Sequence, residues 1–147
     1  MRIGIGADHG GFILKKPVIE AIEEMNLEYK DYGTCSEESC DYPDIALKVT
    51  SALKDKEIDK AVLLCGTGIG ICIAANKVKG IRCAHVTDAF SAQMSAEHND
   101  ANIISMGGRI TSPEDAKEIV KAYLSAQFAG GRHQRRVDKI KQIENNN

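Results

Sequence analysis

The chain has 147 residues, close to the commonest size of a single domain, and we expect residues 1–147 to form one domain. A hydrophobic fraction of 43% and a charged fraction of 27% exclude a disordered chain, and a net charge of −2 gives no overall field that would attract nucleic acid or an anionic membrane. The sequence contains neither the apolar run of ~20 residues that a membrane span requires nor the apolar stretch of a signal peptide, so we expect a soluble cytoplasmic protein.

The cysteines agree with a reducing compartment. Their number is odd and no two stand in a C-x-x-C pair, so neither a disulfide framework nor a zinc knuckle is indicated. The five are Cys35, Cys40, Cys65, Cys72 and Cys83.

The first third of the chain alternates between strand and helix patterns. Residues 2–8 predict a strand that ends in a glycine turn, and residues 11–25 carry apolar side chains at helical spacing. Pro17 fits that helix only near its first turns; elsewhere it would kink it. Residues 28–32 predict a short second strand, and residues 41–53 predict a helix with an early proline.

The alternation continues through the middle of the chain. Residues 61–65 form a continuous apolar run, which is typical of a strand covered on both faces. Residues 69–76 are apolar nearly all round, which predicts a buried helix. Residues 81–86 and 101–106 predict two further strands, and residues 87–97 predict the helix between them.

Two helices complete the chain. Ser112, followed by Pro113 and two acidic residues, predicts a capped helix start, and the double glycine at 130–131 predicts where that helix ends. Residues 133–144 predict a last, basic helix. Its apolar stripe is too thin to be stable alone in water, so we expect residues 132–147 to pack on a partner subunit.

Five rounds of strand and helix predict an α/β fold, in which a five-stranded parallel sheet carries helices on both faces. In such sheets ligands bind beyond the carboxyl ends of the strands. Nearly every polar or reactive candidate follows a strand: Asp8-His9-Gly10-Gly11, Gly33-Thr34, the segment 65–70, Thr87-Asp88 and Gly107-Gly108-Arg109.

The segment 65–70, CGTGIG, is the most informative of these. Ile71 stands where a dinucleotide fingerprint needs its third glycine, and the lysine of a phosphate-binding P-loop is missing, so NAD and ATP are disfavoured. The backbone N–H groups at the start of a helix still form an anion site. Cys65 directly precedes them, and a helix N-terminus stabilises a thiolate, so Cys65 is a candidate base or nucleophile. The alternative is a buried thiol beside a simple turn.

The remaining titratable residues have competing interpretations. Asp8 and His9 form a pair in the expected pocket, or a helix cap beside a surface imidazole. His98 follows a helix and precedes a strand, which puts it at the opposite edge of the sheet within one subunit. His85 lies in a strand and is expected to be packed. Cys72 and Cys83 lie in apolar segments, and we expect them only to fill space.

A basic segment, GGRHQRR, occupies residues 130–136. Arg132 and Arg136 are four residues apart, on one helical face, and two arginines so placed can bind a phosphate. The alternative is a solvated cationic face. A nucleic-acid surface would need more basic residues interleaved with aromatic ones.

Five motifs in order, spanning nearly the whole chain, resemble ribose-5-phosphate isomerase of type B, a family that includes galactose-6-phosphate and allose-6-phosphate isomerases. They are GADHGGF at 6–12, DYPD at 41–44, CGTGIGICIAANKVKGIRC at 65–83, SAEHNDANI at 95–103 and GGRHQRRV at 130–137. The residue before GTGIG is a cysteine, and in this the chain resembles the branch of the family that uses a thiol as the base.

The resemblance implies a three-layer, Rossmann-like α/β/α sandwich in a homodimer or homotetramer whose sites are shared between subunits. Sharing would let His98 reach a partner's pocket. The implied catalytic residues are Cys65 as the base, His98 as the acid that opens the sugar ring, Asp8 and Thr67. The implied substrate-binding residues are Asp8, His9, Gly66, Thr67, Gly68, Ile69, Gly70, Asn99, Arg109, Arg132 and Arg136. No metal or organic cofactor is implied.

We therefore expect an aldose–ketose isomerase that interconverts ribose 5-phosphate and ribulose 5-phosphate through an enediolate. One alternative is an isomerase of a six-carbon sugar phosphate, because the length of the pocket cannot be read from the sequence. A second is a non-catalytic module that binds a sugar phosphate with the same glycine loop.

Overall fold

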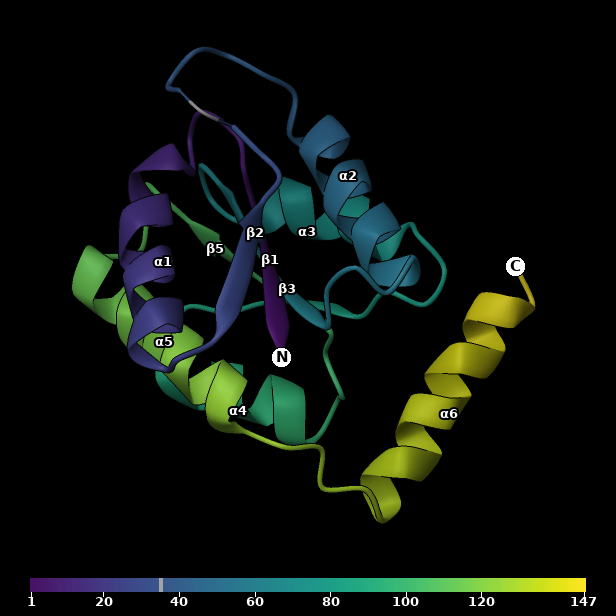
Figure 1. The fold of residues 1–147 in the computed structure, drawn as a ribbon. Coiled ribbons are helices and arrows are strands. Elements are labelled where there is room, and N and C mark those ends of the chain that lie inside the picture. Colours follow the sequence, from purple (N-terminus) through teal and green to yellow (C-terminus); the bar gives the residue numbers. More distant parts are fainter. Residues whose placement is uncertain (35) are drawn as a thin grey trace.

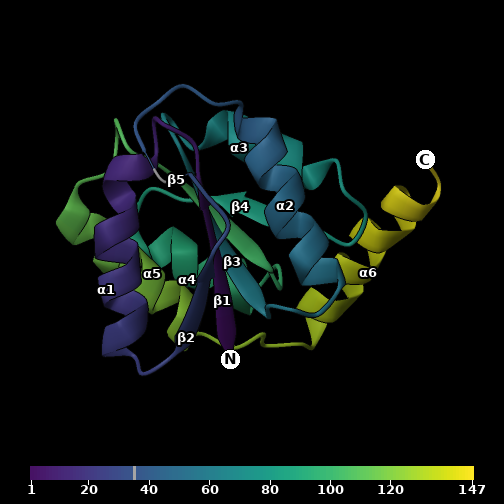
Figure 2. The same cartoon turned by 45° about the horizontal axis from the view of Figure 1, so that its top comes forward.

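A computed structural model describes residues 1–34 and 36–147, so Cys35 lies outside the described residues. Its centre is a sheet of five parallel strands in the order β2-β1-β3-β5-β4. Helices cover both faces of this sheet (Figures 1 and 2). The predicted α/β sandwich with a parallel five-stranded sheet is therefore confirmed.

The observed elements follow the predicted ones closely. The strands are β1 (Arg2–Ala7), β2 (Glu28–Asp31), β3 (Lys60–Cys65), β4 (Cys83–His85) and β5 (Ile103–Gly107). The helices are α1 (Lys15–Glu24), α2 (Tyr42–Lys54), α3 (Ile69–Asn76), α4 (Ala89–Glu97), α5 (Pro113–Ser125) and α6 (Arg132–Asn145), with a 3₁₀ turn, η1 (Phe12–Leu14), before α1.

The strand order reverses beside β1. From β1 the chain first moves to β2 on one side and then crosses to β3 on the other side. Ala7 pairs with Leu64, and Cys65 pairs with Gly107, so the carboxyl ends of β1, β3 and β5 lie next to one another. This reversal is where open α/β sheets bind ligands.

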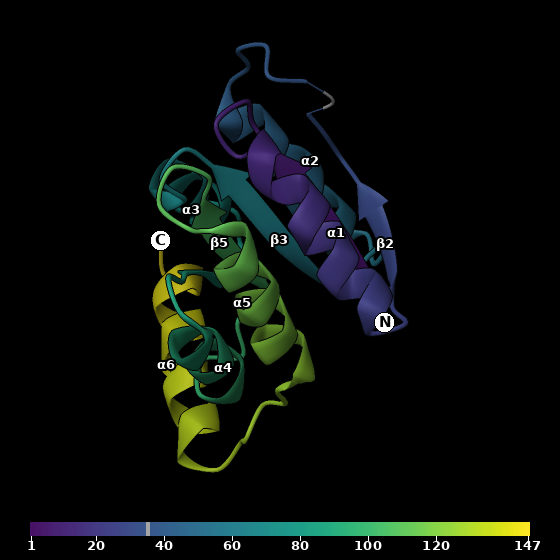
Figure 3. The same cartoon turned by 90° about the vertical axis from the view of Figure 1, so that its left-hand side faces the viewer.

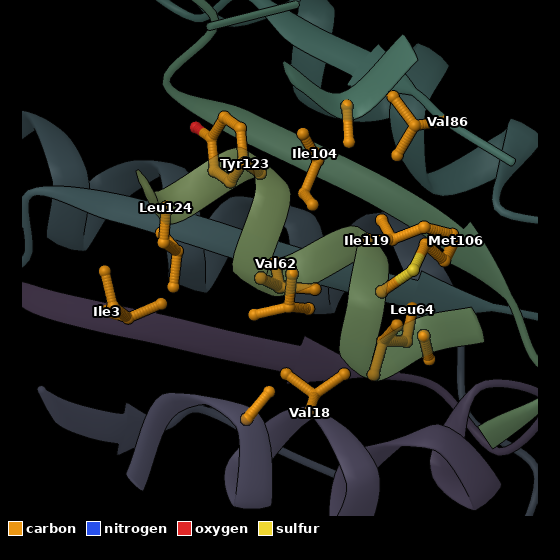
Figure 4. Packing of buried hydrophobic residues seen from close by; sticks show 14 of the residues in the cluster. Ile3, Val18, Val62, Leu64, Val86, Ile104, Met106, Ile119, Tyr123 and Leu124 are labelled. Carbon is orange, nitrogen blue, oxygen red and sulfur yellow. The ribbon is translucent and has the colours of Figure 1, made fainter. Parts of the chain in front are cut away.

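Each face of the sheet has its own apolar core. On one face, α1, α4 and α5 pack on β1, β3 and β5, and Figure 4 shows side chains of α5 and α1 meeting those of the strands. Tyr123 is fully buried there, and its hydroxyl donates to Ala101 O at 2.6 Å. On the other face, α2 and α3 pack on the same strands through residues such as Val49, Leu63 and Ile71.

Local signals explain several helix starts. Ser112 Oγ accepts a hydrogen bond from Asp115 N at 3.1 Å, and Pro113 occupies the first helical position, as predicted for α5. Asp88 caps α4 in the same way, since its Oδ1 accepts from Ser91 N at 2.7 Å. Pro17 lies in the first turn of α1, where it removes no helical hydrogen bond.

Some predictions were wrong. The helix α5 ends at Ser125 and not at the double glycine; Gly131 instead precedes α6 with a φ of 56°. The helix α3 is not buried all round, because Ile69 and Ile73 are 50% and 57% exposed. His85 is exposed rather than packed, since β4 is the edge strand of the sheet.

The two edges of the sheet differ in how their backbones are covered. On β4, the side chain of Asn76 pairs with the backbone of Cys83: Oδ1 accepts from Cys83 N at 2.8 Å, and Nδ2 donates to Cys83 O at 2.9 Å. The other edge, β2, has four exposed residues with the sequence EYKD.

The last helix lies outside the two helical layers of the sandwich, and its side chains contact the sandwich at His98 and Gly80. Figures 1 and 3 show α6 joined to it by the extended segment after α5. His133 and Val137 are buried, while Ile140 and Ile143 are 45% and 66% exposed. No helix in the described ranges is long and apolar enough to cross a membrane.

Candidate active site

A pocket of about 470 Å³ lies at the carboxyl ends of β1, β3 and β5. Its position is the one that the reversal of strand order predicts. The pocket is lined by Asp8, His9, Gly10, Tyr42, Cys65, Gly66, Thr67, Ile69, Gly70 and Arg109. Most of the substrate-binding residues implied by the resemblance therefore meet at one place.

Cys65 is the last residue of β3 and is 4% exposed. Its sulfur accepts a hydrogen bond from Gly68 N at 3.1 Å, which closes a tight turn between the strand and α3. A backbone N–H directed at a sulfur stabilises the thiolate more than the thiol. The described contacts therefore fit a reactive thiol as well as a buried one.

The glycine loop turns sharply to bring that N–H to the sulfur. Gly68 has a φ of 82°, a left-handed conformation that glycine adopts without strain, and a Cβ there would lie 2.8 Å from His85 Cδ2. The next backbone amide of the loop also makes a hydrogen bond: Ile69 N donates to Thr67 Oγ1 at 3.2 Å. The Thr67 hydroxyl can therefore donate its own proton into the pocket.

Asp8 follows β1 and is buried. Its Oδ1 accepts from Gly10 N at 2.8 Å and from Gly11 N at 3.0 Å. These bonds hold the turn before η1; Gly11 precedes η1 and Leu14 precedes α1, so Asp8 is not the helix cap that was the alternative expectation. Asp8 also lines the pocket, so the residue that holds the turn borders the ligand space.

His9 has a defined tautomer when its ring is neutral. Its Nδ1 accepts a hydrogen bond from Cys40 N at 3.2 Å, so the proton of the neutral ring lies on Nε2. His9 lines the pocket and is partly exposed. An Nε2–H donor suits a hydroxyl or phosphate oxygen of a ligand.

Arg109 provides the positive charge of the pocket. Its backbone N donates to Gly66 O at 3.0 Å, which ties the loop after β5 to the loop after β3. The side chain is exposed and lines the pocket. A guanidinium there can bind an anionic oxygen in a bidentate manner.

Tyr42 was not among the predicted site residues, although it lies in the DYPD motif. Tyr42 is the first residue of α2, and its ring packs so closely on Gly70 that a Cβ on this glycine would lie 2.7 Å from Tyr42 Cζ. Its position in a motif that also resembles the family was the only signal that could have identified it.

Five residues implied by the resemblance are not among those that line the pocket in the part of the chain that the structure describes. Gly68 lies in the loop itself, between residues that do, and the other four lie elsewhere. These four are His98, Asn99, Arg132 and Arg136. His98 caps the carboxyl end of α4, and the two arginines belong to the first turns of α6. Within one chain, the predicted placement of His98 away from the strand ends is therefore confirmed.

His98 and His133 connect these distant segments. Their rings stack with centroids 4.1 Å apart and an interplanar angle of 9°. Desolvation, followed by the charges of His98, Arg132 and Arg136, lowers the pKa of His133. The stack joins α4 to α6.

Cys72 of α3 and Cys83 of β4 lie next to each other, outside the pocket. Cys72 is buried, and its sulfur donates to Cys83 O at 3.4 Å. The hydrogen bond with the Cys72 thiol, followed by burial, raises the pKa of the Cys83 thiol. Cys65 remains the thiol that lines the pocket.

A larger groove lies away from the pocket, between α6 and the β4 edge. Its volume is about 750 Å³, and Ile81 and Ala84 on one side face Ile140 and Ile143 on the other. Asn99, an implied substrate-binding residue, lines this groove, whereas none of the residues of the pocket does. Among residues 1–34 and 36–147, no group of three or more His, Cys, Asp or Glu side chains could hold a metal ion.

The chain is similar to known proteins over nearly all of its length. The sequence model of the family described as Ribose/Galactose Isomerase matches residues 3–140. The protein named Ribose-5-phosphate isomerase B of Escherichia coli (strain K12) is 48% identical over 143 residues, which are 97% of this chain and 96% of that protein.

Solved structures give the same result. Ribose-5-Phosphate Isomerase B of Clostridium thermocellum has a TM-score of 0.96 and 50% identity, with 99% of each chain covered. Ribose-5-phosphate Isomerase B of Mycoplasma genitalium, solved with bound ribulose-5-phosphate, has a TM-score of 0.93 and 38% identity, with 99% of this chain and 97% of that chain covered. The fold, the pocket and these similarities agree, and the chain belongs to the ribose/galactose isomerase family.

Proposed function

We propose that this protein is an aldose–ketose isomerase that interconverts ribose 5-phosphate and ribulose 5-phosphate. The observation that carries the proposal is Cys65, which lines the pocket at the switch of strand order and whose sulfur receives the Gly68 N–H at 3.1 Å. Relatives named for this reaction, at about half identity over the whole chain, support the same substrate.

Cys65 is the proposed base. Its thiolate removes the proton from C2 of the open-chain aldose and leaves an enediolate. The same thiol returns the proton to C1, while a hydroxyl proton moves from O2 to O1. The reaction is balanced without an external oxidant or reductant, so the proposal includes no cofactor and no metal. A base held beside two adjacent carbons can serve both transfers.

The enediolate oxygens need hydrogen-bond donors. Two loop amides are already engaged, since Gly68 N bonds to Cys65 and Ile69 N bonds to Thr67. The proposed donors are therefore the Thr67 hydroxyl and the other amides of the loop, those of Gly66, Thr67 and Gly70. Donors fixed before the reaction stabilise developing charge at low reorganisation cost.

Ring opening and phosphate binding are assigned to two groups of residues. His98 is the proposed acid that opens the ring with Asp8, and Asn99 is a proposed substrate contact. Arg132 and Arg136 are the proposed phosphate ligands, together with His9 and Arg109.

We further propose a homodimer as the smallest active unit, because His98, Asn99 and the α6 arginines lie outside the pocket of their own chain. The exposed Ile140 and Ile143 of α6 support an interface there, since association would remove them from water. A homotetramer built from such dimers is compatible with the same site. We propose that the protein is cytoplasmic and that it acts on a small phosphorylated sugar rather than on nucleic acid.

The second candidate substrate is a six-carbon sugar phosphate, which the family description favours by naming galactose. The deciding experiment measures kcat/KM in parallel on ribose 5-phosphate, allose 6-phosphate and galactose 6-phosphate. We expect ribose 5-phosphate to be the best substrate. A higher value for either hexose would reassign the substrate, and no turnover of any of the three would support a non-catalytic binding module.

A further inference from the structure

His85 makes a contact that the proposed mechanism does not use. It is the last residue of β4, and its Nε2 lies 2.8 Å from Thr67 O. A carbonyl oxygen only accepts, so Nε2 carries the proton and donates. The ring also lies against Gly68, where a Cβ would be 2.8 Å from His85 Cδ2.

The carbonyl that receives this bond belongs to the peptide whose N–H faces the reactive sulfur. In a trans peptide the C=O and N–H groups point in opposite directions. Thr67 O therefore points toward His85, while Gly68 N points toward Cys65 Sγ at 3.1 Å. Fixing the oxygen at one end fixes the direction of the N–H at the other end.

The next peptide of the loop is held in the same way. Ser105 Oγ on β5 donates to Gly68 O at 2.8 Å, and the opposite end of that peptide, Ile69 N, donates to Thr67 Oγ1 at 3.2 Å. Two neighbouring strands thus hold two successive carbonyl groups. The N–H group at the other end of each of these two peptides donates to the side chain of a pocket residue, Cys65 or Thr67.

We propose that His85 is a positioning residue, which orients the Thr67–Gly68 peptide so that the Gly68 N–H stabilises the Cys65 thiolate. A donor on the carbonyl also polarises the peptide and strengthens its N–H bond to sulfur. His85 touches no reacting atom and acts only through this peptide. The proposal rests on the proposed function in that Cys65 is taken as the base.

The test compares His85→Leu with His85→Gln. The exposed position tolerates either side chain. Leucine has no donor, whereas the glutamine amide carries an N–H close to the place of Nε2. Two quantities are measured: kcat and KM on ribose 5-phosphate, and the rate at which iodoacetamide alkylates Cys65 at neutral pH, followed by mass spectrometry of its peptide.

In His85→Leu we expect kcat and the alkylation rate of Cys65 each to fall about fivefold, with KM little changed, which is the effect of losing one hydrogen bond of ~1 kcal/mol. His85→Gln restores both rates to within about twofold at an equal melting temperature. Unchanged rates in His85→Leu would overturn the proposal, and so would equal losses in both variants with a lowered melting temperature.

The alkylation measurement separates this proposal from the proposed function. If Cys65→Ala keeps its activity, Cys65 is not the base. Slower alkylation of Cys65 in His85→Leu, rescued in His85→Gln, would still support the positioning of the sulfur.

Discussion

At the scale of single residues, the pocket depends on side chains with two tasks. Asp8 holds a turn and lines the pocket, and His9 lines the pocket while its Nδ1 accepts from Cys40 N. Such contacts hold a group at a defined position before substrate arrives. Catalysis by positioned groups requires this fixed geometry.

Cys65→Ala tests the proposed base. We expect turnover to fall by about 10²–10⁴-fold, the usual contribution of a positioned base, while folding and substrate binding are kept. Steady-state kinetics and isothermal titration with ribose 5-phosphate measure these two effects. Turnover within about tenfold of the parent protein would contradict the role of Cys65.

Cys72→Ala is the matched control, because this thiol is buried but lies outside the pocket. We expect it to lose about 1 kcal/mol of stability through lost packing and to keep its turnover.

His98→Asn tests the proposed ring opening. We expect turnover of ribose 5-phosphate, which is mostly cyclic, to fall much more than turnover of erythrose 4-phosphate, whose blocked C4 hydroxyl prevents ring closure. The measurement compares kcat/KM of the variant and the parent protein on both substrates. Equal losses on both would assign His98 to proton transfer or to structure.

Much of the site could be predicted from the sequence, because the carboxyl ends of the strands in a parallel sheet meet at one edge. Asp8, Cys65 and Arg109 were predicted to meet there, and they line one pocket. Tyr42 was given no role, because its contact with Gly70 depends on the angle between α2 and α3. Hydrophobic periodicity gives the faces of helices but not such angles.

At the scale of elements, α6 is joined to the sandwich through His133, and the protonation of this histidine affects the stability of the folded protein. His133 has a lowered pKa because of desolvation and the nearby charges of His98, Arg132 and Arg136, so in the folded protein it protonates at lower pH than its ordinary value of 6.5. As the pH falls below this ordinary value, the unfolded chain binds the proton first, and acid therefore favours unfolding.

His133→Phe tests this coupling, since phenylalanine keeps a flat ring against His98 and cannot titrate. Between about pH 7.5 and about pH 5.5, we expect the melting temperature of the parent protein to fall more than that of the variant. Differential scanning calorimetry at fixed protein concentration measures the difference. Parallel pH profiles for the two proteins would contradict it.

The elements themselves were largely predictable, and the errors have physical causes. The apolar run at 61–65 became the buried strand β3, and Ser112 caps α5 as expected. The exposed side chains of α3 were wrongly expected to be buried, because apolar residues all round a helix do not reveal how many neighbours the helix has. His85 was misplaced for a related reason, since the strand order decides which strand is the edge.

At the scale of the whole molecule, the proposed shared site predicts complementation. Cys65→Ala and Arg136→Ala are each expected to be inactive alone, and Arg136→Ala chiefly by a raised KM, because a phosphate contact binds ground and transition states alike. Mixing the two under subunit-exchange conditions should restore activity, since some heterodimers contain one intact pocket. Exchange confirmed by native mass spectrometry without recovered activity would exclude the shared phosphate site.

The amide of Asn76 on the backbone of Cys83 has a consequence for how copies of this protein can meet. A parallel sheet with an open edge is a template on which further strands, and finally fibres, can grow. Here the side-chain amide occupies the outward hydrogen-bonding groups of Cys83, and the opposite edge, β2, has the exposed charged sequence EYKD. Polymerisation through a continuous sheet is thereby disfavoured at both ends. We therefore expect copies of this protein to associate through helical surfaces rather than through pairing of strands at either edge of the sheet.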